Sequence, residues 1–257
     1  DWLRTPSGGA TTEVLANSTT GFNSVIVQNI GAVFDESPLQ LADMNGDGLQ
    51  DPAQLLVSGQ TVQVLYKLNL GFGNWSPNWS TITLTGLDAS QANVSELEDV
   101  NGDGLTDVVA VSGNEVRVAL NRNGDRFDAV MTLTTANLAQ GSMMPVRGTN
   151  TVVTYADMNG NGSDDIVWIQ PSGQVQYLEL FPVRPNLISR IDNGIGAVQV
   201  ITYGTSIAEQ ARDAAANMPW ANRVPNAYST VKRMESFVTL TGSDTSGLKE
   251  IMTYKYH

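Results

Sequence analysis

Carboxylate and amide side chains recur three times along this chain at the same spacing. Each copy is a nine-residue loop with Asp or Asn at positions 1, 3, 5 and 9 and glycine at positions 4 and 6. The loops cover residues 43–51, 99–107 and 157–165, so their starts are 56 and 58 residues apart. Oxygen donors at this density are the ligands that a hard cation such as Ca²⁺ prefers. The spacing therefore predicts three calcium loops on a repeated structural unit.

The expected ligands of each ion are the four side chains together with the backbone carbonyl at position 7, and the glycines supply the left-handed backbone that wraps the loop around the ion. These residues are, loop by loop, Asp43, Asn45, Asp47, Leu49 and Asp51; Asp99, Asn101, Asp103, Leu105 and Asp107; and Asp157, Asn159, Asn161, Ser163 and Asp165. Asn161 stands where the other loops have Asp, so the third ring holds one fewer carboxylate. We expect the third site to lose its ion first.

Two other interpretations of the loops were weighed against calcium binding. An EF-hand begins similarly but requires a bidentate Glu at position 12 and helices on both sides. Position 12 is Gln54, Ala110 and Trp168, so that motif is excluded. A turn rich in Asp and Asn that binds no ion stays open for any single copy, and the threefold repetition favours metal.

The chain is acidic, with 26 Asp and Glu against 14 Lys and Arg and a net charge of −12. Nine of the acidic residues lie in the three loops, so metal sites account for much of this charge. Sequence-independent binding to nucleic acid is not expected from such a balance. No stretch of 18 apolar residues predicts a membrane span, and no cysteine is present to form a disulfide. Loose calcium sites suit millimolar extracellular calcium, which indicates a secreted protein.

Residues that would indicate catalysis are scarce. The single histidine, His257, leaves no pair for acid–base chemistry, and neither a GxSxG motif nor a Walker loop is present. Glycosidase-like carboxylate pairs are conceivable among the loop aspartates, but metal ligation explains those residues better. Trp75, Trp79 and Tyr66 could stack against a sugar, although packing within a sheet is the more frequent role of such residues. The sequence therefore predicts a protein that is not an enzyme.

The same order of elements follows each loop. A short apolar strand ends at a Ser-Gly turn, an alternating strand follows, and a turn with Gly and Phe leads to a further strand. The first strands are expected at 55–57, 108–111 and 166–169, and the second at 62–66, 116–120 and 175–178. Several short strands per repeat at a period near 50 residues predict β-propeller blades. Residues 1–22 follow the same order, with Asp1 as the last ligand of a truncated loop, so we expect a fragment of a longer protein.

A different module begins after Pro182. Strands are expected over 185–191 and 197–203, and again over 236–241 and 248–256 as a hairpin around 242–247. Between the two pairs, Ser206 and Glu209 form a capping box that opens a short helix, which stops at Pro219. The predicted fold is therefore all-β, with propeller blades over 1–183 and a small β-rich module with one short helix over 184–257. Because the blades are few, we expect residues 1–183 to have at least one strand edge that is unpaired or is covered by another copy of the chain.

The loops resemble FG-GAP/VCBS repeats, the calcium-loop blades of integrin α-chain propellers, over residues 1–183. The segments 184–196, 201–203 and 254–257 look like the region that follows the propeller in the SpvB/TcB family, the B components of bacterial toxin complexes. That resemblance implies a secreted, non-enzymatic shell protein. Its propeller would close a hollow cocoon around a toxic fragment and dock the pore-forming A component.

The expected function is that of a calcium-stabilised propeller scaffold that docks a large protein partner and gates a toxin-complex shell. Surface loops on a rigid scaffold carry binding, so the calcium loops are expected to support the contact surface and not to form it. A calcium-dependent cell-surface adhesin or lectin propeller is the first alternative. An enzyme that carries the propeller as an accessory domain is the second.

Overall fold

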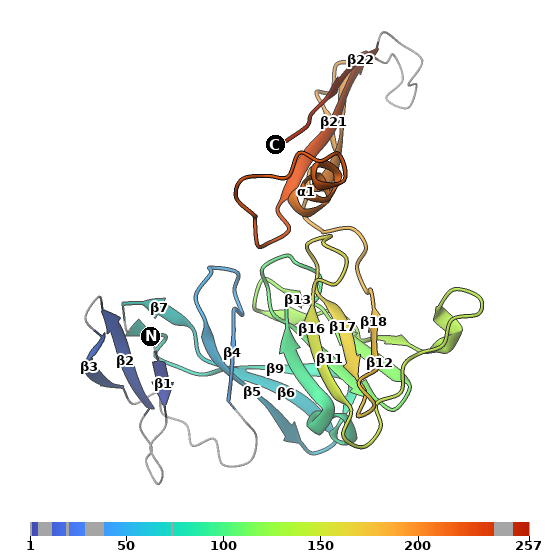
Figure 1. The fold of residues 1–257 in the computed structure, drawn as a ribbon. Helices are drawn as coiled ribbons and strands as arrows, with labels where there is room; N and C mark the ends of the chain where they lie inside the picture. The colour runs from blue at the N-terminus through green and yellow to red at the C-terminus, as the bar shows by residue number, and fades with distance from the viewer. Residues whose placement is uncertain are drawn as a thin grey trace. The chain divides into compact units, whose positions relative to one another are not determined.

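The computed structural model describes residues 2–4, 12–18, 21–28, 39–72, 74–238 and 249–256. Strands dominate these ranges, with one α-helix, α1 (Ser206–Ala215), and two short 3-10 helices, η1 (Ala89–Val94) and η2 (Thr135–Asn137) (Figure 1). The all-β fold class is therefore confirmed for the described part. No helix within it has the length and hydrophobicity that crossing a bilayer requires.

Contacts within the chain divide it into two compact units. The first comprises Asp1–Asp99, Gly104–Val153 and Trp168–Gln174, and the second comprises Val100–Asp103, Thr154–Val167 and Val175–His257. The third nine-residue loop thus belongs to the same unit as the C-terminal module. The predicted domain boundary between residues 183 and 184 stays a prediction.

The first unit is built on antiparallel sheets. Two of them have four strands, in the orders β4-β5-β6-β9 and β10-β11-β12-β15 (Figure 1). Their bounds are β4 (Gln40–Ala42), β5 (Asp51–Ser58), β6 (Thr61–Tyr66) and β9 (Ser80–Asp88), then β10 (Ser95–Glu98), β11 (Asp107–Ser112), β12 (Glu115–Ala119) and β15 (Met131–Leu133). A three-stranded sheet precedes them, formed by β1 (Trp2–Arg4), β2 (Thr12–Ser18) and β3 (Gly21–Gln28). The strands expected after the first two loops are confirmed.

The first two nine-residue loops each connect a short strand to the longer strand that follows it. Strand β4 pairs with β5 across the first loop, and β10 pairs with β11 across the second. The strands before these two loops were not predicted from the sequence, because they have only three or four residues of mixed polarity. The loop is therefore the tight connection of an antiparallel pair, and its conformation sets the pairing of both strands.

The core of the first unit joins its two four-stranded sheets. Alternate residues of β6 and β12 point inward, as the polar–apolar alternation predicts. The fully buried members include Val62 and Val64 in one sheet and Val108 in the other. The Tyr66 hydroxyl reaches from the first sheet and donates a hydrogen bond to the Gly124 carbonyl at 2.6 Å. This tyrosine is thus part of the core packing and not of a sugar platform.

Two hairpins of equal length extend from these sheets. The first joins β7 (Asn69–Gly71) to β8 (Asn74–Trp75), and the second joins β13 (Asn121–Arg122) to β14 (Arg126–Phe127). In each, the third and fourth residues have positive φ angles, with Phe72 at +51° in the first and Gly124 at +76° in the second. Phe72 therefore occupies a backbone position where the other hairpin has glycine, and its side chain is fully exposed.

We expect Phe72→Gly to leave the free energy of unfolding unchanged within about 1 kcal/mol. The substitution removes the strain of a left-handed non-glycine residue, which stabilises the folded state by about 1–2 kcal/mol. It also gives the unfolded chain more conformational freedom, which costs about 0.5–1 kcal/mol. Phe127→Ala is the matched control, because Phe127 packs against the core. It should lose about 2–3 kcal/mol, less than a fully buried Phe. Urea unfolding measures both, and a loss above about 2 kcal/mol for Phe72→Gly would show that Phe72 supports the fold.

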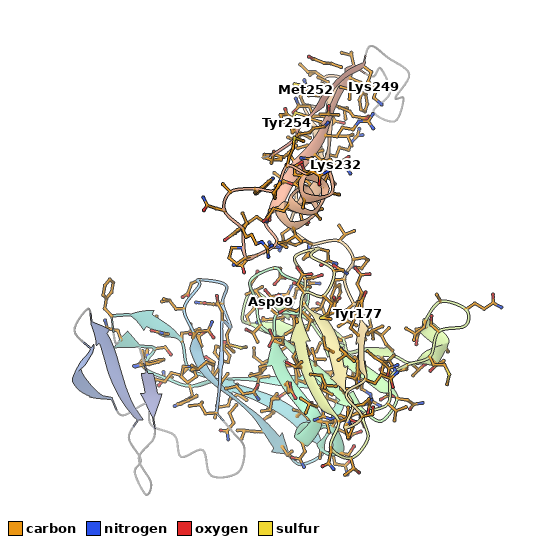
Figure 2. The ribbon with its side chains drawn as sticks, in the orientation of Figure 1. Asp99, Tyr177, Lys232, Lys249, Met252 and Tyr254 are labelled. Atoms are coloured by element: carbon orange, nitrogen blue, oxygen red, sulfur yellow. The ribbon has the colours of Figure 1, made fainter. Side chains whose placement is uncertain are left out.

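The second unit contains the C-terminal sheet, in the order β19-β20-β21-β22, with helix α1 between its second and third strands along the chain (Figure 1). The strands are β19 (Arg190–Asp192), β20 (Ala197–Thr205), β21 (Ser229–Val238) and β22 (Lys249–Thr253). Figure 2 shows the side chains of Lys232, Lys249, Met252 and Tyr254 projecting from this sheet. Residues 152–178 supply a further three-stranded sheet, formed by β16 (Val152–Ala156), β17 (Asp165–Ile169) and β18 (Val175–Leu178).

Several predicted boundaries in this module are wrong. The strand expected over 185–191 begins only at Arg190, because Asn186, at φ +64°, turns the chain. The helix is capped by Thr205 and not by Ser206: the Thr205 hydroxyl accepts from the Ala208 N–H at 3.2 Å. The Ser206 hydroxyl is instead held by the backbone of residues 226 and 228. The helix ends at Ala215, four residues before Pro219.

The last predicted hairpin is described only in part. Its first strand begins at Ser229, earlier than predicted, and its second ends at Thr253. The turn at 242–247 and His257 lie outside the described residues, as do Asp1 and the turn at 6–8. The truncated first loop therefore stays a prediction.

The described sheets are not closed into a propeller ring. Each four-stranded sheet of the first unit has the meander order of a blade, except that the small hairpin lies between its third and fourth strands in sequence. Open strand edges of this kind agree with the expectation that at least one edge is unpaired. The closed propeller itself is not a property of the described part.

Candidate metal-binding loops

The carboxylate at position 1 organises the backbone of each loop. In the first loop Asp43 accepts hydrogen bonds from the N–H groups of positions 4 and 6, both at 2.7 Å. Asp157 accepts the same two bonds in the third loop, at 2.7 and 2.9 Å. In the second loop Asp99 accepts from the Gly104 N–H at 2.8 Å. The loops thus share one local fold, and the glycines at positions 4 and 6 all have positive φ angles.

The amides at position 3 also face into the loops. The side-chain oxygens of Asn45, Asn101 and Asn159 accept the N–H of position 5 at 3.2, 2.8 and 2.9 Å. In the first two loops the Nδ2 of this Asn donates to the Asp at position 5, at 3.0 and 3.2 Å. Positions 1, 3 and 5 are therefore brought together in each loop, as the ligand spacing predicts.

The aspartate at position 9 begins the outgoing strand and is completely buried in all three copies. Asp51 accepts hydrogen bonds from the N–H groups of Met44 at 3.0 Å and Asn69 at 2.6 Å. Burial raises the pKa of Asp51 to about 6, despite those two bonds, and the nearby Asp47 and Asp43 add to the rise. A buried carboxylate beside two other carboxylates is costly to ionise, and a bound cation would remove that cost.

The third loop repeats this arrangement with one difference. Asp165 accepts a hydrogen bond from the Met158 N–H at 3.0 Å through Oδ2. Its Oδ1 is buried and accepts no hydrogen bond from the described residues. Burial raises the pKa of Asp165, and the charges of Glu179 and Asp157 raise it further. The Asp165 Oδ1, an oxygen of the third loop's predicted ligand set, is thus left without a hydrogen-bond partner within the described part of the chain.

The donor chemistry of the loops fits Ca²⁺. Every predicted ligand atom is a carboxylate, amide or carbonyl oxygen, and a carboxylate that accepts one or two N–H groups keeps lone pairs for an ion. Among the described residues, no group of three or more Asp, Glu, His or Cys side chains is arranged so that it could hold a metal ion. Amide and carbonyl oxygens must therefore complete any site, as the nine-residue pattern requires. The ligand assignment stays a prediction, including the carbonyls of Leu49, Leu105 and Ser163.

Several residues that contact the loops were not predicted from the sequence, among them Asn69, Asn121 and Glu179. The backbone N–H groups of Asn69 and Asn121, in the two hairpins, donate to Asp51 and to Asp107, the latter at 2.8 Å. Glu179, just after β18, accepts from the amides of two predicted ligands of the third loop. The recurrent Asn at the start of each hairpin was a sequence signal for the first two. An isolated Glu at a strand end gives no such signal.

The aromatic residues considered for sugar binding do not form one platform. Tyr66 is buried, and Trp75 and Trp79 are partly buried. The Lys67 Nζ lies 5.9 Å from the centre of the Trp79 ring, a cation–π contact that occupies one ring face. Packing accounts for Tyr66 and for this face of Trp79.

Two family models match parts of the chain. The model described as an FG-GAP-like repeat matches residues 99–168, which include the second and third loops. The model described as the insecticide toxin TcdB middle/N-terminal region matches residues 142–257. No curated protein is similar enough in sequence to count as a relative.

Solved structures of toxin-complex proteins have a similar fold. A Tc holotoxin pore from Photorhabdus luminescens aligns with 88% of this chain and 11% of its own, with a TM-score of 0.69 and 22% identity. A TcdB2-TccC3 structure without its hypervariable C-terminal region aligns with 96% of this chain and 12% of its own, with a TM-score of 0.65 and 22% identity. The chain thus spans about one-eighth of the length of these proteins. It is similar in fold to Tc toxin chains, and from residue 142 onward in sequence to the TcdB middle/N-terminal region.

Proposed function

We propose that this chain is part of a secreted bacterial, non-enzymatic β-propeller scaffold of the SpvB/TcB type. It would bind calcium in its three loops, dock a large protein partner and gate the shell of a toxin complex. The observation that carries the proposal is the family match over residues 142–257, which takes in the third loop and the whole C-terminal module. The solved structures with this fold are described as assemblies of TcdB2 with TccC3 and as a holotoxin pore.

Contacts between successive repeats support a scaffolding role for the loops. The Thr106 N–H, in the second loop, donates to the Asp43 carbonyl of the first loop at 2.8 Å. The Asn121 amide, from the second hairpin, donates to the Met44 carbonyl at 2.9 Å. The first two residues of the first loop are therefore held by the repeat that follows it. An ion in such a loop would stiffen the junction between blades and leave other loops to meet the partner.

The tip of the first hairpin presents two exposed apolar side chains in the first unit. Leu70 is more than half exposed and Phe72 is fully exposed. A large apolar side chain in a strained backbone position, without a packing role, is typical of a binding residue. We infer that the partner covers this tip.

The test uses the full-length parent chain that contains these blades and the pore-forming A component of a toxin complex. We expect capture of the A component in calcium, and at least about tenfold weaker capture by Phe72→Asp, as for an anchor residue. Arg126→Asp, on the tip of the second hairpin, is the matched surface control and should bind as the wild type does. No capture by the folded parent chain would refute docking, and selective binding on a glycan array instead would favour a lectin.

A further inference from the structure

Glu179 follows strand β18, and its carboxylate reaches the third loop. Its Oε1 accepts hydrogen bonds from the side-chain amides of Asn159 at 2.7 Å and Asn161 at 2.8 Å. These amides stand at positions 3 and 5, so both belong to predicted ligands. The carboxylate of Glu179 therefore lies beside two predicted ligand side chains, on the side of their amide nitrogens, although it is remote from the loop in sequence.

The contact falls where the third loop lacks a charge. Position 5 is Asp47 in the first loop and Asp103 in the second, but Asn161 in the third. In the first two loops the position-3 amide donates to the position-5 carboxylate. In the third, the position-3 amide donates to Glu179 instead. Glu179 thus makes the contact that the position-5 carboxylate makes elsewhere.

The buried carboxylate of Asp165 gives a second, independent indication of a ligand. Its Oδ2 is fixed by the N–H of Met158, inside the loop, so the carboxylate is directed at the loop. Its Oδ1 is buried without a hydrogen-bond partner among the described residues. In the first two repeats the backbone N–H of a hairpin residue, Asn69 or Asn121, donates to the Oδ1 of the position-9 aspartate. A buried carboxylate oxygen left unpaired is costly unless a cation or donor meets it.

We propose that Glu179 is a ligand of a Ca²⁺ ion in the third loop, where it replaces the position-5 carboxylate that Asn161 lacks. The inference rests on the proposed calcium binding. The Oε1 of Glu179 meets the amide nitrogens of two predicted ligand side chains, Asn159 at 2.7 Å and Asn161 at 2.8 Å, so the carboxylate lies beside the groups whose oxygens would bind the ion. Glu179 already accepts two hydrogen bonds, and its carboxylate has further lone pairs for an ion.

One consequence reverses an expectation from the loop sequence. With Glu179 as a ligand, the third loop draws on three carboxylates, Asp157, Asp165 and Glu179, the same number as Asp99, Asp103 and Asp107 offer in the second, although neither set converges as a metal site in the described residues. Affinity in oxygen-ligand sites rises with ligand charge. The third site should therefore hold its ion about as tightly as the second, and should not be the first to empty.

The experiment follows each loop separately in the whole chain. Every loop has two glycines, so calcium titration of ¹⁵N-glycine-labelled protein reports on Gly46, Gly102 and Gly160 individually. Glu179→Gln should raise the calcium midpoint for Gly160 at least about tenfold and leave the other two unchanged. Asp164→Asn is the matched control, because it removes one nearby negative charge without removing a proposed ligand. The calcium midpoint of Gly160 in the Asp164→Asn chain should shift less than about threefold, as expected for a partly exposed charge.

A rescue variant separates ligation from loop support. Restoring the position-5 carboxylate with Asn161→Asp in the Glu179→Gln chain should return the midpoint to near the wild-type value. If Glu179 only holds the amides in place, the side-chain oxygen that remains after Glu179→Gln would still accept their hydrogen bonds, and the midpoint would stay near that of the wild type. A Glu179→Gln midpoint no higher than that of Asp164→Asn, or a failed rescue in a folded chain, would overturn the proposal. If no loop glycine of the wild type responds to calcium, the calcium proposal itself fails.

Discussion

Removal of calcium should lower the melting temperature of this chain more than any single substitution considered above. An ion that binds only the folded state stabilises it by about 2.7 kcal/mol per site at a hundred times its Kd. Three independent sites would together add roughly 8 kcal/mol by the same relation, which is comparable to the whole stability of an ordinary domain. Thermal unfolding in millimolar calcium and then in excess chelator measures the shift.

Ligand variants show whether the shift arises in the loops. Asp103→Ala removes a carboxylate ligand, and Asn161→Ala removes only an amide, so Asp103→Ala should cost more stability in calcium. In chelator the two variants should differ less. Replacement of calcium by magnesium is the ion control, because Mg²⁺ demands octahedral geometry and keeps its waters. A melting temperature indifferent to the chelator would contradict the calcium account and leave three tight turns.

Gly124→Ala should be the most destabilising of the single substitutions. Gly124 has a φ of +76°, and an added Cβ would lie 2.6 Å from the Met44 carbonyl oxygen, a backbone atom of the first loop. The left-handed strain costs about 1–2 kcal/mol, and forcing an extra carbon into a packed contact costs about 1–3 kcal/mol. We expect a loss of about 2–5 kcal/mol in urea unfolding, the sum of those two costs.

The control for the steric contribution is Gly113→Ala. Gly113 also has a positive φ, of +55°, but an added Cβ would meet no atom within 4 Å. Its loss should equal the strain alone, about 1–2 kcal/mol. Equal losses for the two substitutions would show that the second hairpin does not press on the first loop.

The loops and the strands after them could be predicted because their signals are local. The nine-residue pattern places its donors without any contact from elsewhere in the chain, and the apolar runs after Asp51 and Asp107 are short and β-prone. The alternation in 62–66 and 116–120 likewise predicts the inward face of β6 and β12. Periodicity and turn chemistry determine such features, and both can be read directly from sequence.

The remaining features depend on contacts between distant residues. Thr205 and Ser206 are both good helix caps, and the choice is made by backbone groups of residues 226 and 228 that hold the Ser206 hydroxyl. Strand β10 has two glutamates in four residues, so its pairing depends on its neighbour β11. Glu179 looks like an ordinary solvated residue until the fold brings it to Asn159 and Asn161. Closure into a ring is likewise a matter of pairing between distant strands, and the described sheets are not closed.

The most direct test of the central claim is a count of the calcium ions bound by the folded chain. Equilibrium dialysis against ⁴⁵Ca²⁺ at millimolar calcium should give about three ions per chain, one for each oxygen-ligand loop. The triple variant Asp43→Ala, Asp99→Ala and Asp157→Ala, if folded, should bind none of them. A folded wild-type chain that binds no calcium under these conditions would contradict the account, because the three loops would then be connections between strands and nothing more.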